Sequence, residues 1–306
     1  MNCLILGANG FIGRNLVKEL SLNSDNFITV FDRDEKEWNL NQVKTIAGNF
    51  SANFNFDQIT KNQDVVFHLI STTTPNANKD LCLEIEENVF STIKLLDSCV
   101  KNKVKKVIFI SSGGTVYGES DGTPFNELNS TLPICSYGIQ KLTIEKYLHY
   151  YYHKYNLDYS VIRLSNPYGP GQNPKGAVGA ICVFMYKALK NQEITIFGDG
   201  TSLRDYIYIG DAIKGIINLS SVKTEEKIFN LGSGYGIDLN EILNHVKILL
   251  GKEISVKYEE QRINDLHYSV LDNQKYLSYF PDHEFVCLKD GMSVMLDYLK
   301  ELKLED

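Results

Sequence analysis

Cys3-Leu-Ile-Leu-Gly-Ala-Asn-Gly-Phe-Ile-Gly13 stands almost at the start of the chain and indicates its fold. The run is apolar until it breaks into glycines, and an amphipathic pattern of helical spacing follows as far as Leu20. We therefore predict a strand, a tight turn and a helix N-terminus. Backbone N–H groups free of side chains, together with the positive end of the helix dipole, suit a pyrophosphate. We expect cofactor binding by Gly7, Gly10, Phe11, Ile12 and Gly13.

A second predicted strand, residues 27–31, ends at Asp32, about 20 residues beyond the glycines. A carboxylate at this position bonds the ribose 2′-hydroxyl and repels a 2′-phosphate, which favours NAD over NADP. Arg33 beside it keeps NADP open as an alternative. A purely structural role for the glycines is the other interpretation, and the position of Asp32 argues against it.

Composition and charge exclude several classes of protein. The 306 residues are 43% hydrophobic and carry a net charge of −7, enough for one large or two small domains. The lysines at 101–106 predict a solvated loop rather than a nucleic-acid site, and no apolar run could span a bilayer. The six irregularly spaced cysteines predict reduced thiols, no metal site and a cytoplasmic protein.

The pattern along the chain predicts an α/β fold with a doubly wound parallel sheet, the Rossmann arrangement. Strand-like segments at 43–47, 64–70, 106–111 and 158–164 alternate with helical segments near 80–102 and 136–156. Prolines and glycines from 167 to 176 then introduce shorter mixed elements, and 228–231 reads as another core strand. We expect a dinucleotide-binding domain of 1–165 plus about 206–245, and a smaller mixed α/β substrate domain of about 166–205 plus 246–306.

Glycines at 232, 234 and 236 resemble a second phosphate loop. The run Asp238-Leu-Asn-Glu241 favours a helix capping box there instead.

Tyr137-Gly-Ile-Gln-Lys141 opens the predicted helix at 136–156. Residues i and i+4 share a helical face, so the ammonium can lie beside the phenol. That charge, together with NAD+, would lower the pKa of Tyr137 and make it a proton acceptor near neutral pH. The pair follows the segment 110–118 at the end of a core strand, the edge at which such sheets bind ligands.

These motifs together resemble the extended short-chain dehydrogenase/reductases, and among them the nucleotide-sugar epimerases of the UDP-galactose and UDP-N-acetylglucosamine 4-epimerase type. The resemblance covers nearly the whole chain. It includes the glycine turn, the Ser-Ser-x-x-x-Val-Tyr-Gly run at 111–118, Tyr137 and Lys141, and the segments 68–75, 88–92 and 163–169. Two further segments, 204–209 and 262–265, match the family's diphosphate-binding arginine motifs, although surface ion pairs are the alternative for these arginines.

The resemblance implies a set of site residues. Besides the glycine turn, it assigns cofactor binding to Asp32, Arg33, Asn49, Leu69, Ser71, Asn88, Ser111, Ser112, Tyr137 and Lys141. It assigns substrate binding to Asn166, Arg204, Tyr206, Arg262, Asp265 and Ser269. His68 is expected to be a satisfied strand-end histidine.

The implied reaction is NAD-dependent 4-epimerisation of a nucleotide sugar, with Tyr137 as base and a transient 4-keto sugar. The resemblance also implies an isomerase of polysaccharide biosynthesis and a homodimer whose helices 80–102 and 136–156 form a four-helix bundle. We expect neither nucleic acid nor a membrane as partner.

One departure from the family pattern concerns the hydroxyl that usually bonds the 4-oxygen, because Gly113 occupies its position. Thr115 is the preferred replacement as a catalytic residue, and Ser112 is the alternative. Gly114 and Thr115 also argue against a 4,6-dehydratase, which needs Asp and Glu there. Asn49 stands where the family often has Asp, and we expect this difference to have little effect on cofactor binding.

The small Ser269 favours UDP-GlcNAc and UDP-GalNAc, with UDP-Glc and UDP-Gal also possible; Tyr268 could fill the same space. Two other functions stay open. One is a nucleotide-4-ketosugar reductase, against which Asp32 argues. The other is a non-catalytic NAD-binding relative, suggested by Gly113 and opposed by the presence of both Tyr137 and Lys141.

Overall fold

The computed structural model describes residues 1–75, 80–176, 178–261 and 266–303. The chain divides into two compact units. Unit 1 comprises Met1–Val116, Pro133–Arg163 and Ile213–Phe229, and unit 2 comprises Tyr117–Leu132, Leu164–Ala212 and Asn230–Asp306. Within the described ranges, no helix combines the length and apolar character needed to cross a membrane.

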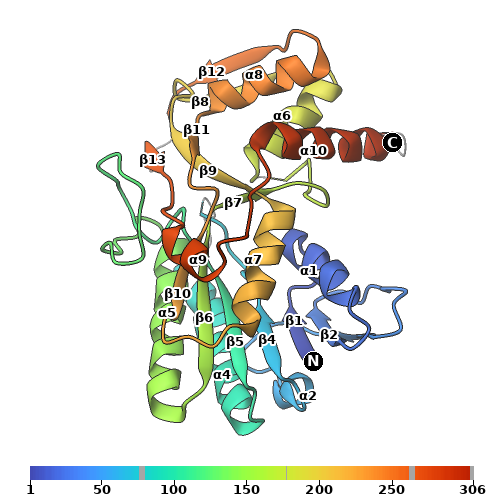
Figure 1. Cartoon of the computed structure of the whole chain (residues 1–306), viewed down its shortest axis with the longest axis vertical. Coiled ribbons are helices and arrows are strands. Elements are labelled where there is room, and N and C mark those ends of the chain that lie inside the picture. The colour runs from blue at the N-terminus through green and yellow to red at the C-terminus, as the bar shows by residue number, and fades with distance from the viewer. Residues whose placement is uncertain (76–79, 177, 262–265, 304–306) are drawn as a thin grey trace. The chain divides into compact units, whose positions relative to one another are not determined.

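Residues of unit 1 form most of a seven-stranded, mostly parallel sheet of order β10-β6-β5-β4-β1-β2-β3 (Figure 1). Its strands are β1 (Asn2–Leu6), β2 (Phe27–Asp32), β3 (Val43–Ala47), β4 (Val65–His68), β5 (Lys106–Ser112), β6 (Asp158–Leu164) and β10 (Ile228–Leu231). Leu6 pairs in parallel with Phe31 of β2 and with His68 of β4. The strand order therefore reverses beside β1, and ligands bind beyond the carboxyl ends of strands at such a point. The predicted doubly wound α/β fold is confirmed.

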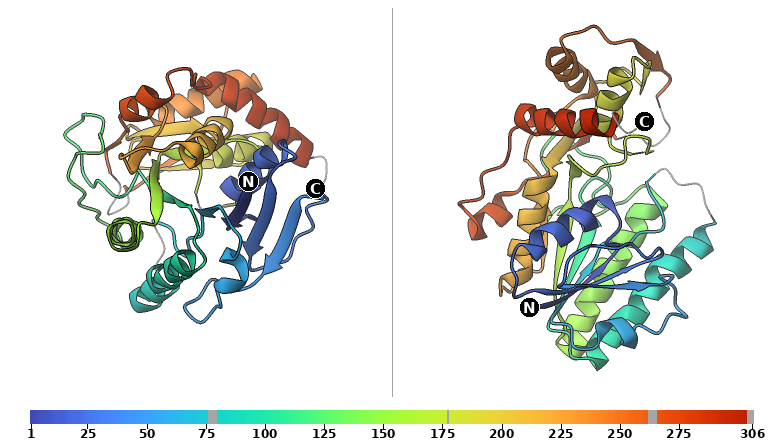
Figure 2. Two further views of the ribbon diagram at one scale, coloured as in Figure 1. Left: turned by 60° about the horizontal axis from the view of Figure 1, so that its bottom comes forward. Right: turned by 90° about the vertical axis from the view of Figure 1, so that its right-hand side faces the viewer.

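Helices cover both faces of this sheet, as Figure 2 shows. Helices α1 (Phe11–Ser21) and α7 (Ile209–Ser221) lie over one face, and α4 (Ser91–Lys101) and α5 (Ser136–Tyr155) lie over the other. Short helices α2 (Asp57–Thr60) and α3 (Leu81–Ile85) accompany them, and a π-helical turn η1 (Glu86–Phe90) joins α3 to α4. Cover on both faces is why the strands read as continuous apolar runs, and Leu6, Phe31 and Phe109 are fully buried in this core.

Unit 2 is a smaller mixed α/β assembly, as predicted. Strand β9 (Leu203–Tyr208) pairs with β7 (Asn166–Tyr168), β11 (Gly236–Ile237) and β13 (Tyr268–Ser269), and β8 (Ile194–Phe197) pairs with β12 (Val256–Glu259). The helices of this unit are α6 (Ala180–Leu189), α8 (Leu239–Leu250), α9 (Gln274–Tyr279) and α10 (Leu288–Lys303). Met185, Val246 and Met292 from three of these helices are buried in one core. The capping box is confirmed, since Asp238 Oδ1 accepts the Glu241 N–H at 2.7 Å and α8 begins there.

The units divide the chain differently from the predicted domains at residues 117–132, 164–165, 206–212 and 230–245, which all group with unit 2. The segment 117–132 joins unit 2 through Phe125, whose N–H donates to Val270 O at 2.9 Å and whose carbonyl accepts the Asp272 N–H at 2.7 Å. The Asn230 side chain also donates to Phe125 O, at 2.7 Å. These pairings join residues more than a hundred positions apart, so local patterns do not reveal them.

Candidate functional site

The glycine turn after β1 uses each of its glycines for a different physical reason. Gly7 has a left-handed φ of +86°. Gly10 is the N-cap of α1 and has no side chain to accept a hydrogen bond. The first N–H groups of the helix are therefore not capped and can donate to a ligand. A Cβ on Gly13 would lie 2.2 Å from the Gly7 carbonyl oxygen, so only glycine lets the helix pack this closely on the turn.

Asp32 ends β2 beside this turn. Its carboxylate accepts the backbone N–H groups of Asn9, at 2.9 Å, and of Arg33, at 2.8 Å. Its backbone carbonyl accepts the Gly48 N–H at 2.9 Å, which places the exposed Asn49 directly after β3 on the same edge of the sheet. The turn and the predicted adenosine-side residues are therefore brought together. The Arg33 side chain is exposed.

The first turn of α5 carries Tyr137 against the end of β5. The Ser112 hydroxyl forms a hydrogen bond with the Tyr137 side chain and lowers its pKa, but burial has the larger effect and raises the pKa of Tyr137 to about 12. The protein alone therefore does not produce the predicted lowering of the Tyr137 pKa, because burial of the phenol outweighs its hydrogen bond with Ser112. A positive charge added by bound NAD+ would act in the opposite direction.

Lys141 lies beside the phenol, as the i, i+4 spacing predicts. Its Nζ is 5.6 Å from the centre of the Tyr137 ring and 4.7 Å from that of Phe109, and it donates to Ile110 O at 2.8 Å. Burial lowers the pKa of Lys141 to about 7, and the nearby Glu145 carboxylate opposes this shift. The amine thus sits close to the point at which it gains or loses a proton at neutral pH.

The two candidate hydroxyls around Gly113 lie in different surroundings. Ser112 contacts the phenol of Tyr137. Thr115 Oγ1 is buried and has no hydrogen-bond partner among the residues that the structure describes. The Thr115 carbonyl packs against Gly138, where a Cβ would come within 2.6 Å of it. Ser112 is therefore the hydroxyl placed at the phenol, and a role for Thr115 stays a prediction.

Ser111 is engaged inside unit 1. Its hydroxyl donates to Glu145 Oε1 at 2.5 Å, and Arg163 Nη2 donates to Glu145 Oε2 at 2.7 Å. The ion-paired side chains of Arg163 and Glu145 are 3% and 1% exposed. Ser111 was expected to bind the cofactor, but its hydroxyl faces helix α5 because successive strand residues point to opposite faces. Sequence reasoning missed Glu145, although it lies one helical turn after Lys141.

Asn88, on the π-helical turn, links two parts of the predicted cofactor site. Its Oδ1 accepts the Thr72 N–H at 2.9 Å, and its Nδ2 donates to Gln140 Oε1 at 2.8 Å and to Glu84 O at 3.0 Å. Its amide thus fixes the loop after β4 to helix α5, and Asn88 itself is 5% exposed.

That loop carries the other predicted residues. The Leu69 N–H donates to Leu6 O at 3.1 Å, and Ser71 Oγ donates to Thr73 O at 2.9 Å. A hollow of about 10 Å³, about the room for one water, is lined by Ile70, Ser71, Asn88, Tyr137, Gln140, Lys141 and Ile144. Four of the predicted site residues therefore meet around one small space.

His68 is a buried strand-end histidine, as expected, but its ring is only half satisfied, since Nδ1 has no hydrogen-bond partner among the residues that the structure describes. Its Nε2 lies 2.9 Å from Thr92 Oγ1. Burial, assisted by Lys141, lowers the pKa of His68 to about 3, so the ring is neutral at physiological pH.

In unit 2, strand β9 brings four predicted substrate residues onto neighbouring strands. Asn166 of β7 pairs with Tyr206, and Ser269 of β13 pairs with Arg204. The Asn166 Nδ2 donates to Asp205 O at 2.8 Å, and Ser269 is 3% exposed. Two further predicted residues, Arg262 and Asp265, lie outside the described residues.

The glycines after β10 surround a carboxylate of the protein itself. A Cβ on Gly232 would lie 2.2 Å from Asp205 Oδ2. Asp205 Oδ1 accepts the Ser233 N–H at 2.8 Å, and its Oδ2 accepts the Gly234 N–H at 3.3 Å. These N–H groups are used internally, which agrees with rejecting a second phosphate loop here.

Comparison with known proteins identifies the family to which these features belong. Residues 3–232 match the NAD dependent epimerase/dehydratase family. The chain belongs to this family.

Two relatives and one solved structure illustrate its range of reactions. The chain is 31% identical to a putative UDP-glucose 4-epimerase of Methanocaldococcus jannaschii, over 97% of this chain and 98% of that one. It is 30% identical to a dTDP-4-dehydro-6-deoxyglucose reductase of Escherichia coli, over 97% of both. A UDP-glucuronic acid 4-epimerase of Bacillus cereus, in complex with NAD and UDP-4-deoxy-4-fluoro-glucuronic acid, matches with a TM-score of 0.91 and 26% identity over 99% of this chain and all of that one.

The residues of unit 1 fit the family's dinucleotide. The uncapped helix after Gly10 and the glycines of the turn leave room and donors for a pyrophosphate. The half-exposed Asp32 supplies an acceptor at the end of β2. Tyr137 and Lys141 stand at the end of β5 on the same edge of the sheet.

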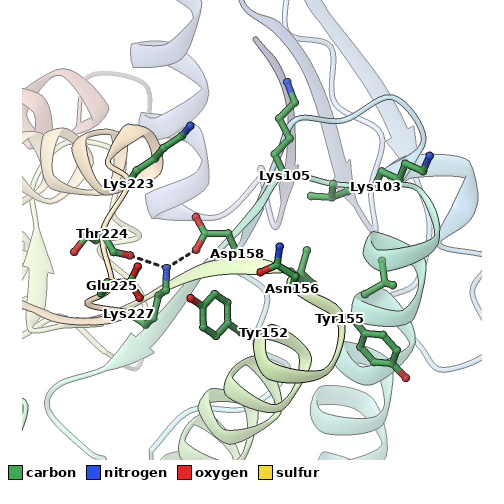
Figure 3. A pocket seen from close by; sticks show the side chains of 13 residues that line it. Lys103, Lys105, Tyr152, Tyr155, Asn156, Asp158, Lys223, Thr224, Glu225 and Lys227 are labelled. Atoms are coloured by element: carbon green, nitrogen blue, oxygen red, sulfur yellow. Dashed lines mark hydrogen bonds and ion pairs between the residues drawn. The ribbon is translucent and has the colours of Figure 1, made fainter.

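A larger hollow at the opposite ends of the strands, of about 830 Å³, lies away from these residues (Figure 3). Lys227 in it is held by Asp158 at 2.6 Å and by Thr224 O at 2.7 Å, and the ammonium groups of Lys103, Lys105 and Lys223 point apart. No converging donor set is formed there, so the hollow lacks the features of an anion site.

The lysine cluster at 101–106 is mostly paired at the surface. Lys101 pairs with Asp57, and Lys105 with Asp64 at 2.7 Å. The prediction of a solvated loop is wrong for Lys106, which begins β5 and is 6% exposed. Its Nζ donates to Leu219 O of α7 at 2.8 Å and to Val222 O, just after that helix, at 2.7 Å.

Proposed function

We propose that the protein is an NAD-dependent nucleotide-sugar 4-epimerase, an isomerase that inverts the C4 hydroxyl of a UDP-hexose. The observation that carries this is the catalytic turn of α5, where Tyr137 contacts the Ser112 hydroxyl while Lys141 lies against the phenol ring. The catalytic turn shares its edge of the sheet with the glycine turn after β1. A proton acceptor and a dinucleotide site together suit reversible oxidation of a secondary alcohol.

The roles of the residues follow from their contacts. When bound, NAD supplies the redox chemistry at the sugar C4 carbon, with no net oxidation over a full turnover. Tyr137 accepts the proton of the 4-hydroxyl and returns it to the epimer. Ser112, or Thr115 in the role first predicted for it, donates a hydrogen bond to the 4-oxygen. Lys141 bonds the nicotinamide ribose and holds positive charge beside the phenol.

The remaining cofactor contacts divide between the two ends of the dinucleotide. The glycine turn holds the pyrophosphate, and Asp32 with Asn49 holds the adenosine side. The segment of Leu69 and Ser71, fixed by Asn88, borders the nicotinamide side.

The nucleotide sugar is held by residues of unit 2. Arg204 and Arg262 bind the diphosphate through their planar donors, with Asp265 and Tyr206 supporting the nucleotide. Asn166 bonds the diphosphate or the sugar. The small Ser269 leaves space for a 2-N-acetyl group, which favours UDP-GlcNAc and UDP-GalNAc over UDP-Glc and UDP-Gal. The product suits synthesis of polysaccharide in the cytoplasm.

The proposal includes a homodimer formed through α5 and the helical segment of 81–101. Phe90 on η1 and Ile139 on α5 are each 53% exposed, and Ile85 and Tyr150 are exposed beside them. Such an apolar face on adjacent helices suits a second copy of the chain in a four-helix bundle. Phe90→Asp should convert a dimer to a monomer in light scattering. Leu22→Asp, at the C-cap of α1, should leave it unchanged, and a dimer in both variants would contradict the interface.

The test of the reaction is NMR of the purified protein with NAD+ and, in turn, UDP-GalNAc, UDP-Gal and UDP-galacturonic acid. Conversion to a mixture of 4-epimers without accumulation of NADH supports the proposal. Tyr137→Phe is expected to lower kcat about 10²- to 10⁴-fold, the usual contribution of an acid–base group. The proposal fails if Tyr137→Phe converts the substrate as fast as the wild type.

A nucleotide-4-ketosugar reductase is the second candidate, favoured by the 30% identity to the E. coli reductase. It would consume a reduced cofactor and release it. Oxidation of NADPH or NADH by a 4-ketosugar, with no epimerisation of any UDP-hexose, would assign this reaction instead.

A further inference from the structure

Glu84 of α3 is a buried carboxylate to which no role has been assigned above. It is 1% exposed. Its Oε1 accepts the Thr73 hydroxyl at 2.7 Å. Its Oε2 accepts the Ser136 hydroxyl at 2.7 Å and the Gln140 side-chain N–H at 2.8 Å. A buried carboxylate costs free energy unless hydrogen bonds satisfy it, and here both oxygens are engaged by side chains of other elements.

Two of these partners flank the proposed base. Ser136 directly precedes Tyr137, and Gln140 directly precedes Lys141. Gln140 Nε2 also donates to Ser136 Oγ at 2.8 Å, so the carboxylate and the two side chains form a closed ring of hydrogen bonds. The catalytic turn is therefore tied to α3 on both sides of Tyr137.

Helix α5 lacks the usual devices for fixing its own start. Its N-cap is Cys135, which makes no side-chain capping hydrogen bond, and its first turn contains no acidic residue. Negative charge near a helix N-terminus is stabilising, because the unpaired N–H groups there carry partial positive charge. The Glu84 carboxyl group, on another helix, accepts the hydroxyl of Ser136 in this first turn.

The same network reaches the nicotinamide-side loop. Thr73, which bonds Glu84, belongs to the loop after β4. Gln140 Oε1 accepts the side-chain N–H of Asn88. Asn88 Oδ1 in turn accepts the Thr72 N–H at 2.9 Å. The loop and the catalytic turn are thus joined through one carboxylate and two amides, all from residues that are buried or half-buried.

We propose that Glu84 is a positioning residue that holds the turn of Tyr137 and Lys141 in register with the loop at 71–73. This inference rests on the proposed function. A base must be held within about 0.5 Å of its working position, and a displacement of about 1 Å can cost about 100-fold in rate. Loss of Glu84 therefore acts on kcat, whereas KM depends on the substrate residues of other elements.

The test uses the full chain with NAD+ and its best UDP-sugar. Glu84→Gln keeps the shape of the side chain but replaces one accepting oxygen with an NH₂ group. In place of Oε2 this group meets the Gln140 N–H donor, and in place of Oε1 it requires the Thr73 hydroxyl to turn and accept. We expect kcat to fall about 10- to 100-fold and KM to change less than about twofold. Glu86→Gln, at an exposed position two residues on, is the matched control and should match the wild type.

Two further measurements separate positioning from general stability. Ser136→Ala should lower kcat in the same direction, and the double variant should be no slower than the slower single variant, because both act through one turn. Hydrogen exchange at residues 136–141 should be faster in Glu84→Gln than in Glu86→Gln, independently of turnover. Should Glu84→Gln fail to fold, Ser136→Ala carries both readouts.

Several outcomes overturn the inference. One is a kcat in Glu84→Gln equal to that of Glu86→Gln. Another is a rise in the KM of Glu84→Gln at constant kcat. A third is a double variant in which the losses of kcat from Glu84→Gln and Ser136→Ala multiply. Unchanged exchange at 136–141 also overturns it. A wild type that epimerises no UDP-sugar instead overturns the proposed function, and the exchange experiment still decides whether Glu84 fixes the turn.

Discussion

Lys141→Met is expected to make the protein without NAD more stable at slightly acidic pH. Lys141 is 5% exposed, and no carboxylate among the described residues forms an ion pair with its ammonium group. Burial lowers its pKa from 10.5 to about 7. The unfolded chain therefore binds a proton that the folded state has lost between about pH 7 and pH 10.5, so the free energy of unfolding of the wild type rises with pH across this window.

The magnitude follows from the shift. Each pH unit in that window contributes up to about 1.4 kcal/mol, which gives at most about 5 kcal/mol of penalty below pH 7. Methionine removes the penalty but leaves the Ile110 carbonyl without its donor, at a cost of about 1–3 kcal/mol. We expect Lys141→Met to be more stable than the wild type by about 2–4 kcal/mol at pH 6.5, and this advantage to shrink by about 2–3 kcal/mol by pH 9.

Urea unfolding at pH 6.5, 8 and 9 measures this difference. The single tryptophan, Trp38, lies in unit 1, so its fluorescence reports on the unit that contains Lys141. Lys146→Met, at an exposed position of the same helix, should stay within about 0.5 kcal/mol of the wild type at each pH. An advantage of Lys141→Met that is absent at pH 6.5, or constant with pH, would refute the reasoning.

Three other substitutions test the remaining parts of the site. Gly13→Ala is expected to lower the melting temperature and remove stabilisation by NAD, because the new Cβ would lie 2.2 Å from the Gly7 carbonyl oxygen. Thermal unfolding with and without NAD measures both effects. A rise in melting temperature with NAD equal to that of the wild type would contradict this. Arg163→Met leaves the buried Glu145 carboxylate without its ion-pair partner and should destabilise the protein by about 3–5 kcal/mol. Urea unfolding should show most of this loss recovered when Glu145→Leu is added, and equal or greater loss in the double variant would argue against a buried ion pair. Asp32→Ser should weaken NAD binding and admit NADP, and calorimetric titrations that show unchanged affinity for both would refute the assigned role.

Local pattern was sufficient for the elements that carry the site. The apolar run and glycines at 3–13 predicted β1, its turn and α1, and 27–32 and 43–47 were both strands as expected. Helix α5 begins at Ser136, where the sequence places it, and the i, i+4 spacing correctly put Lys141 beside Tyr137. These features succeed because helical and strand periodicity depend on neighbours in the chain.

Other features depend on contacts between distant segments. Ser111 and Ser112 are adjacent and chemically alike, yet one faces Glu145 and the other the phenol, since only packing decides which face of a strand is which. The pKa of Tyr137 is set by burial, which no spacing motif reports.

The sequence by itself determined the dinucleotide turn, the catalytic pair and the order of the strands along the chain, because each depends on residues within a few positions of one another. The tertiary structure alone decided that Glu84 bonds Ser136 and Gln140, 52 and 56 positions away. It also decided that residues 117–132 fold with unit 2. Such contacts form only when whole elements bury their apolar faces together, and the chain between them leaves no periodic trace of the pairing.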